Sequence, residues 1–195
     1  MHWIVIRDGQ VTNRRLAGGA GMGLDYALGA GPEAAPSHWD DRGELAGWWT
    51  DDVCDGGALI DADRRVMLFF TATAHPAYRT AMLDGFTRLW TGWQVAWADG
   101  GVAVLARYVG VDPAAVRSGM PARLGGPESG APHPEALAEL AKRVETFVPG
   151  DIGLQAMREQ LQAGQGARVA LAAMESARDE AAPAAAAAAK LIRGH

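Results

Sequence analysis

The sequence predicts an α+β fold: one mainly antiparallel sheet of about five strands, two hairpins plus one, packed by helices and followed by a helical C-terminal extension. Three observations predict it. Two pairs of apolar runs flank short polar turns, which is typical of β-hairpins. Apolar residues recur every three or four positions through residues 76–90, which indicates an amphipathic helix. The final third of the chain is rich in alanine and carries helical spacing.

Each hairpin has its own turn signal. In residues 2–15, Asp8-Gly9 separates two β-compatible runs, and this dipeptide readily adopts the positive φ values of a tight turn. In the second hairpin, the polar turn 61–64 separates the apolar runs 58–60 and 66–70. The run 66–70 does not alternate between apolar and polar residues, so we expect a central strand covered on both faces.

A helix and a fifth strand follow the second hairpin. Pro76 suits the first position of the helix, whose apolar stripe we expect to pack on the sheet. Residues 93–97 alternate between the two faces of a strand. Short helices are predicted over 102–109 and 112–117.

The glycine-rich stretch 16–32 resembles a nucleotide-binding loop only in composition. Gly19 and Gly21 begin a G-x-G-x-x-G pattern, but Leu24 stands where the third glycine is required, and no G-K-[ST] motif occurs. A phosphate-binding loop also follows a parallel strand and opens a helix, whereas this stretch leaves a hairpin. We therefore expect a structural loop.

The chain divides by composition into three parts. Residues 1–117 form the predicted sheet domain, and 118–134 form a linker or long loop in which ten of 17 residues are Gly, Pro or Ser. Residues 135–195 form the helical, Ala-rich extension, where Glu139 and Arg143 have the spacing of an i,i+4 pair. Its apolar stripe is too slight for stability alone, so we expect it to dock on the sheet domain, on a second copy or on a partner.

Composition excludes several classes of function. The net charge of -5 and a pI near 5.5 disfavour nucleic-acid binding, which needs a basic surface. No run of 18 apolar residues occurs, so no membrane span is expected. A single cysteine cannot form an internal disulfide, and this favours a reducing, cytoplasmic setting for a soluble protein.

Negative charge is concentrated between residues 40 and 63. This segment contains eight acids and one base, a net charge of -7 that exceeds that of the whole chain. Such a segment attracts cations and basic proteins, and indole rings beside it can bind a cationic group. The alternative is that the tryptophans cover one end of the sheet and that Thr50 caps a short turn. The candidate binding residues are Trp39, Trp48, Trp49, Asp40, Asp41, Asp51, Asp52 and Asp55.

No catalytic signature has the required spacing. Cys54 is flanked by aspartates, which raise the pKa of a thiol and suppress the thiolate, so we expect a buried, unreactive side chain. The five histidines lack metal-ligand spacing, and G-x-S-x-G is absent. The sequence therefore predicts no catalytic residue, no metal ligand and no cofactor.

The sequence favours a non-enzymatic binding protein that engages a basic protein through residues 39–55, as an immunity or inhibitor protein does with a cationic toxin. One alternative is a hydrolase-like enzyme that holds a divalent metal with Asp51, Asp52 and Asp55, because such ions take oxygen ligands. The other is a structural protein that forms a homo-oligomer through residues 135–195.

Overall fold

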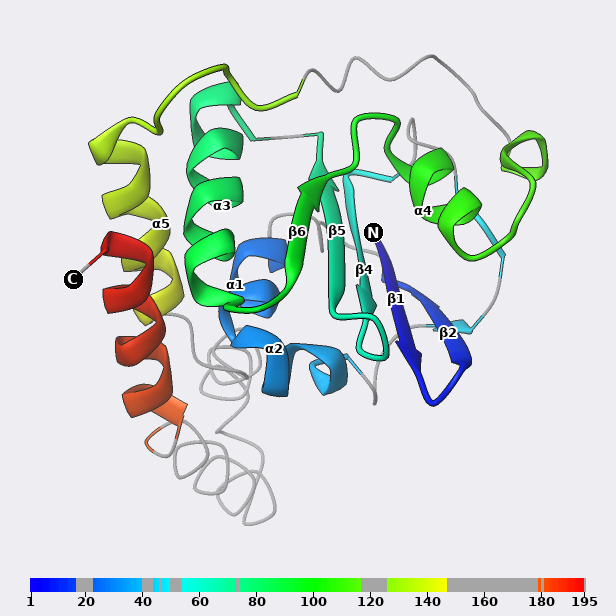
Figure 1. Cartoon of the computed structure of the whole chain (residues 1–195), viewed down its shortest axis with the longest axis horizontal. Coiled ribbons are helices and arrows are strands. Elements are labelled where there is room, and N and C mark those ends of the chain that lie inside the picture. The colour runs from blue at the N-terminus through cyan, green and yellow to red at the C-terminus, as the bar shows by residue number, and fades with distance from the viewer. Residues whose placement is uncertain are drawn as a thin grey trace, which may run out of the picture.

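A mixed six-stranded sheet, with strand order β3-β2-β1-β4-β5-β6, runs through the centre of the protein (Figure 1). The two predicted hairpins are present: β1 (His2–Arg7) with β2 (Gln10–Arg15), and β4 (Gly56–Asp61) with β5 (Val66–Thr71). The α+β class is confirmed. The computed structural model describes residues 1–16, 23–39, 44–45, 47–49, 54–72, 74–116, 126–146, 179 and 181–194.

Parallel pairings join the hairpins to each other and to the last strand. β1 pairs in parallel with β4, and β5 pairs in parallel with β6 (Gln94–Trp97). A parallel neighbour requires a crossover connection, which α3 (Pro76–Leu89) supplies between β5 and β6. The pair of β2 with the two-residue strand β3 (Glu44–Leu45) is antiparallel. Three of the five strand pairs are therefore antiparallel.

The two hairpin turns are tied together by one carboxylate. Asp8 and Gly9 both have positive φ, at 53° and 70°, as the Asp-Gly turn requires. Asp63, in the turn of the second hairpin, accepts hydrogen bonds of 2.8 Å from the backbone N–H groups of both residues. These bonds favour the ionised form and lower the pKa of Asp63.

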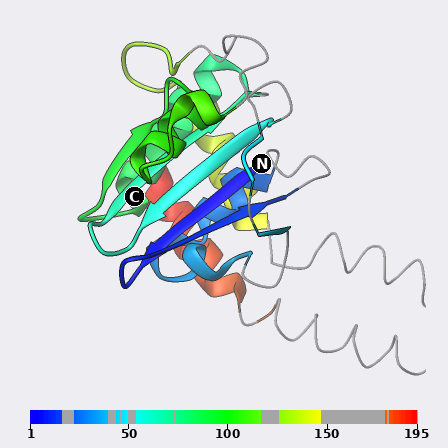
Figure 2. The same ribbon diagram turned by 90° about the vertical axis from the view of Figure 1, so that its right-hand side faces the viewer.

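Helices cover both faces of the sheet (Figures 1 and 2). On one face, α1 (Leu24–Gly29), α3, α5 (Pro134–Thr146) and a C-terminal helix (residues 181–193) enclose the first core, and on the other α4 (Val102–Tyr108) covers the second. Successive side chains of β1 point to opposite faces of the sheet, so Trp3 enters the first core and Ile4 enters the second. The remaining short helices are α2 (Gly31–Ala34), η2 (Ala35–Ser37) and η3 (Pro113–Ala115).

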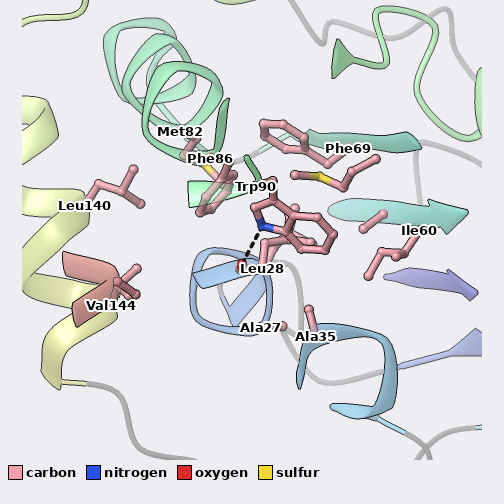
Figure 3. Packing of buried hydrophobic residues seen from close by; sticks show 14 of the residues in the cluster. Ala27, Leu28, Ala35, Ile60, Phe69, Met82, Phe86, Trp90, Leu140 and Val144 are labelled. Atoms are coloured by element: carbon pink, nitrogen blue, oxygen red, sulfur yellow. Dashed lines mark hydrogen bonds between the residues drawn. The ribbon is translucent and has the colours of Figure 1, made fainter. Parts of the chain in front are cut away.

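The first core centres on aromatic side chains of α3 and the sheet (Figure 3). Phe86 packs edge-to-face on Phe69, with ring centroids 5.4 Å apart. Trp90 is fully buried beside them, and its Nε1–H donates a 3.0 Å hydrogen bond to the carbonyl of Leu28 on α1. The indole thus links the C-terminal end of α3 to α1.

The prediction that residues 16–32 form a loop is wrong where α1 and α2 form. Leu24 and Leu28 are fully buried in the first core, so tertiary packing stabilises a helix that is only six residues long. Gly29 allows α5 to approach closely, because a Cβ there would lie 2.6 Å from Cγ2 of Val144. Gly29, one of the glycines on which the loop prediction rested, therefore permits close contact between α1 and α5.

The described part of the extension packs on the sheet domain. Leu140, Val144 and Ile192 belong to the first core, and a Cβ on Gly85 of α3 would lie 2.8 Å from Leu140 and 3.0 Å from Ile192. The division of the chain at 118–134 remains a prediction. Among the described residues, no helix is long and apolar enough to cross a membrane.

We expect Ile192→Ala to lower the free energy of unfolding by about 3 kcal/mol, because it leaves a cavity at a fully buried position. Leu191→Ala is the matched control on the same helix; Leu191 is 47% exposed, so its loss should cost about 0.5 kcal/mol or less. Urea unfolding of both variants measures the difference. Equal effects would show that the helix does not share the core of the sheet.

Candidate functional site

Half of the predicted binding residues fall in the part of the chain that the structure describes. Trp39, Trp48, Trp49 and Asp55 are described, whereas Asp40, Asp41, Asp51 and Asp52 lie outside the described residues, as does Thr50.

Trp48 and Trp49 are positioned by the buried ring of His2. The N–H of Trp49 donates a 2.8 Å hydrogen bond to Nε2 of His2, and Nδ1 of His2 donates to Oδ1 of Asn13 at 3.0 Å. The ring of Trp48 lies 5.0 Å from the imidazole, centroid to centroid, and that of Trp49 lies 6.3 Å away. Both indoles remain partly exposed. The guanidinium of Arg15 lies 5.0 Å from the centroid of Trp49, in cation–π geometry.

This environment keeps His2 neutral. Burial lowers the pKa of the imidazole, and the nearby Met1 amino group and Arg15 lower it further, although the contacts of the ring with Asn13 and with the carbonyl of Trp49, 3.3 Å from Nε2, oppose the shift. Since Nε2 accepts the bond from Trp49, a proton on that nitrogen would remove the acceptor. The backbone position of Trp49 therefore depends on the charge state of His2.

Trp39 belongs to another region of the surface. It packs against the first core, whereas Trp48 and Trp49 pack against the second. Its ring meets His38 edge-on, with centroids 4.6 Å apart. The structure brings two of the three predicted indoles together and places the third over the opposite face of the sheet.

The described carboxylates of the acidic segment have partners in the chain. Asp61 is buried, and it accepts hydrogen bonds of 2.9 Å from the hydroxyl of Tyr108 and from the N–H of Arg64. Asp63 binds the first hairpin turn. Asp55, whose side chain is 29% exposed, lies 3.7 Å from the amino group of Met1. Asp55 and Asp61, each beside a cation, contribute less to an outward negative field than the sequence count suggests, whereas Asp63 is exposed and keeps its charge.

Cys54 is buried, as predicted, and its Sγ–H donates to the carbonyl of Gly56 at 3.0 Å. Burial raises the pKa of the thiol, which suppresses the nucleophilic thiolate. The predicted direction is right, but its main cause is burial rather than the neighbouring aspartates.

A second polar cluster, which sequence reasoning missed, joins three helices. Asp25 of α1 is only 3% exposed, and its Oδ2 accepts hydrogen bonds from the hydroxyl of Tyr78 on α3 at 2.8 Å and from Nε of Arg143 on α5 at 2.5 Å. The guanidinium also lies 5.0 Å from the ring centroid of Tyr26. Burial and the adjacent carboxylate raise the pKa of Tyr78, so this hydroxyl stays protonated and donates.

No local pattern reveals this cluster, because Asp25 and Arg143 are 118 positions apart. The only visible signal is the Glu139–Arg143 spacing, which points to a different partner. Asp25 receives three donors, since the N–H of Tyr26 binds its other oxygen at 3.0 Å. A carboxylate so fully engaged holds the helices together.

A cavity of about 120 Å³ lies beside this cluster. Its described walls come from α1, α2, α5 and the C-terminal helix, and among the described lining residues Tyr26 and His38 carry polar side-chain atoms. Within the described ranges, no group of three His, Cys, Asp or Glu side chains is arranged to hold a metal ion.

Searches of family models, curated proteins and solved structures gave no match to this chain.

We expect Asp25→Asn to lower the free energy of unfolding by about 2 kcal/mol, because it leaves the half-buried guanidinium of Arg143 without its counter-charge. Asp84→Asn is the control, since the Asp84–Arg88 pair lies in one helix with both side chains about one-third exposed. Loss of this exposed ion pair should lower the free energy of unfolding by at most about 0.5 kcal/mol. Denaturant unfolding would contradict this role for Asp25 if the two variants were equally stable.

We expect the protein to lose stability as the pH falls below about 6.5, because unfolded His2 then binds a proton that the folded state, with its lowered pKa, does not. In His2→Gln this part of the pH dependence should disappear. In His133→Gln, where the native imidazole is 69% exposed, it should persist. Unfolding followed by tryptophan fluorescence between about pH 5 and 8 measures it. Superimposable profiles for wild type and His2→Gln would refute the assignment.

Proposed function

We propose that the chain is a non-enzymatic cytoplasmic binding protein that engages a basic protein at the Trp48–Trp49 corner, the surface formed by Arg15, Trp48 and Trp49 over the buried ring of His2. The observation that carries this proposal is the pair of partly exposed indoles fixed on a buried imidazole. Tryptophan and arginine are the residues most enriched among binding hot spots.

Preorganisation supports the proposal. The N–H of Trp49 is held by Nε2 of His2, so part of the cost of ordering this surface is met during folding. His2 is itself held by Asn13 from the neighbouring strand β2. A partner would therefore meet a formed aromatic surface.

The contacts of Arg15 indicate the chemistry that this surface accepts. Its guanidinium already occupies one face of Trp49, so an arginine of a partner would bind in the same geometry on the neighbouring indole of Trp48. The ring of Trp48 packs against the imidazole of His2, and it remains partly exposed, so a partner can contact it.

Charge supports a basic partner. The segment 40–63 has a net charge of -7, of which Asp61 and Asp63 are bound within the chain. The remaining negative charge of the segment would speed association with a cationic protein and make the affinity depend on salt. An inhibitor of a cationic toxin would have this combination of acids and anchoring aromatics. Nothing in the described residues favours the metal-dependent hydrolase or the homo-oligomer instead.

The test uses a deca-arginine peptide as the probe, with a poly-glutamate peptide as its control. We expect the basic peptide to quench tryptophan fluorescence at low salt, and Trp48→Ala to weaken binding about tenfold. Replacing Asp51, Asp52 and Asp55 together with Asn should weaken it by a similar factor and flatten the salt dependence. Trp93→Ala is the matched control, because Trp93 is also partly buried but packs on Trp90.

Affinity capture from a native lysate, with the same variants at low and high salt, extends the test to natural partners. If every captured protein were retained by the triple Asn variant at low salt, the proposal would be abandoned.

A further inference from the structure

The cavity beside Asp25 has the features of a ligand site, and it is independent of the Trp48–Trp49 corner. It lies where α1, the turn after η2, α5 and the C-terminal helix meet. Six of the nine described residues that line it are Gly or Ala, so several segments come together without side chains large enough to fill the space between them.

Close backbone approach fixes one wall of the cavity. Gly29 of α1 faces Val144 of α5 so closely that no side chain fits between them. Val144 is 3% exposed, and both residues line the cavity. This wall therefore cannot move inward to close the space, because the two helices are already in contact.

The lining chemistry selects an uncharged, mainly apolar molecule. None of the described lining residues is Asp, Glu, Lys or Arg, and buried Asp25, next to the lining residue Tyr26 in the chain, is paired with the half-buried Arg143. A free charge entering the cavity would lose its hydration without gaining a counter-ion.

The described lining also contains aromatic and polar groups. Tyr26 and His38 supply a phenol and an imidazole, and His38 is backed by the indole of Trp39. Burial raises the pKa of Tyr26, so the phenol stays uncharged at neutral pH. Rings of this kind favour edge-on or offset contact with another aromatic ring.

We propose that this cavity binds a small uncharged aromatic molecule, of about one six-membered ring with a single hydroxyl-sized polar substituent. The space is partly open to solvent, since Ala30, Ala34 and Ala184 are exposed, and its volume of about 120 Å³ is large enough for one six-membered ring. The polar substituent lies toward Tyr26 and His38, and the ring packs on the alanines of the C-terminal helix.

Such a ligand would connect the C-terminal helix to the rest of the protein. Ala184 and Ala185 face the cavity from this helix, whereas Tyr26 faces it from α1. A molecule in contact with both stabilises the docked position of the helix by mass action.

Phenol is the probe, with benzene and benzoate for comparison, and binding is measured by thermal unfolding and by NMR shifts of the full chain. A ligand of seven heavy atoms binds with a Kd of about 1 mM, so phenol at about 10 mM should raise the Tm by roughly 4 °C. Benzene should give a smaller rise and benzoate none. Phenol should also slow amide exchange within residues 181–193.

Ala185→Leu fills the cavity and should abolish the phenol response, whereas Ala187→Leu, at an exposed position on the same helix, should retain it. Ala34→Leu fills the space from α2 and serves if Ala185→Leu does not fold. The proposal is overturned if wild type shows no shift with either phenol or benzene, if benzoate binds as well as phenol, or if the filled variants respond like wild type.

Discussion

Burial of Trp90 between α3 and α1 is the contact on which the rest of the molecule depends. The indole is fully buried, and its hydrogen bond to Leu28 leaves neither the ring N–H nor that carbonyl unpaired. This contact fixes α1 against the sheet even though a helix of six residues has little stability of its own. Asp25, Tyr26 and Gly29 all lie on α1, so the polar cluster and the cavity are both consequences of that placement.

The alternation of β1 has a second consequence on the other face of the sheet. The period that directs Trp3 into the first core directs His2 to the opposite side, where a polar ring is buried. Burying an imidazole without partners would be costly, and Asn13 and Trp49 remove that cost by binding both ring nitrogens. The positions of Trp48 and Trp49 at the surface therefore follow from the need to hydrogen-bond the buried ring of His2.

Local patterns predicted the elements whose stability is local. Asp8-Gly9 predicted the first turn, and Pro76 with its apolar stripe predicted α3. α1 was missed because its sequence is glycine-rich and its stability comes from distant partners such as Val144. The Asp25–Arg143 pair and the cavity have no sequence signature for the same reason: each joins segments that only the fold brings together. Counting charges could not show that Asp61 is buried or that Asp63 binds the turn of the first hairpin.

The parallel seam between β1 and β4 has a consequence for how the chain acquires its structure. Each hairpin closes over a short loop and can form quickly by itself, but His2 meets Gly57 only after the long intervening segment has been brought around. We therefore expect one hairpin to dock on the other more slowly than either hairpin forms. Before docking, the inner edges of β1 and β4 carry unpaired backbone groups, and strand edges of this kind favour aggregation.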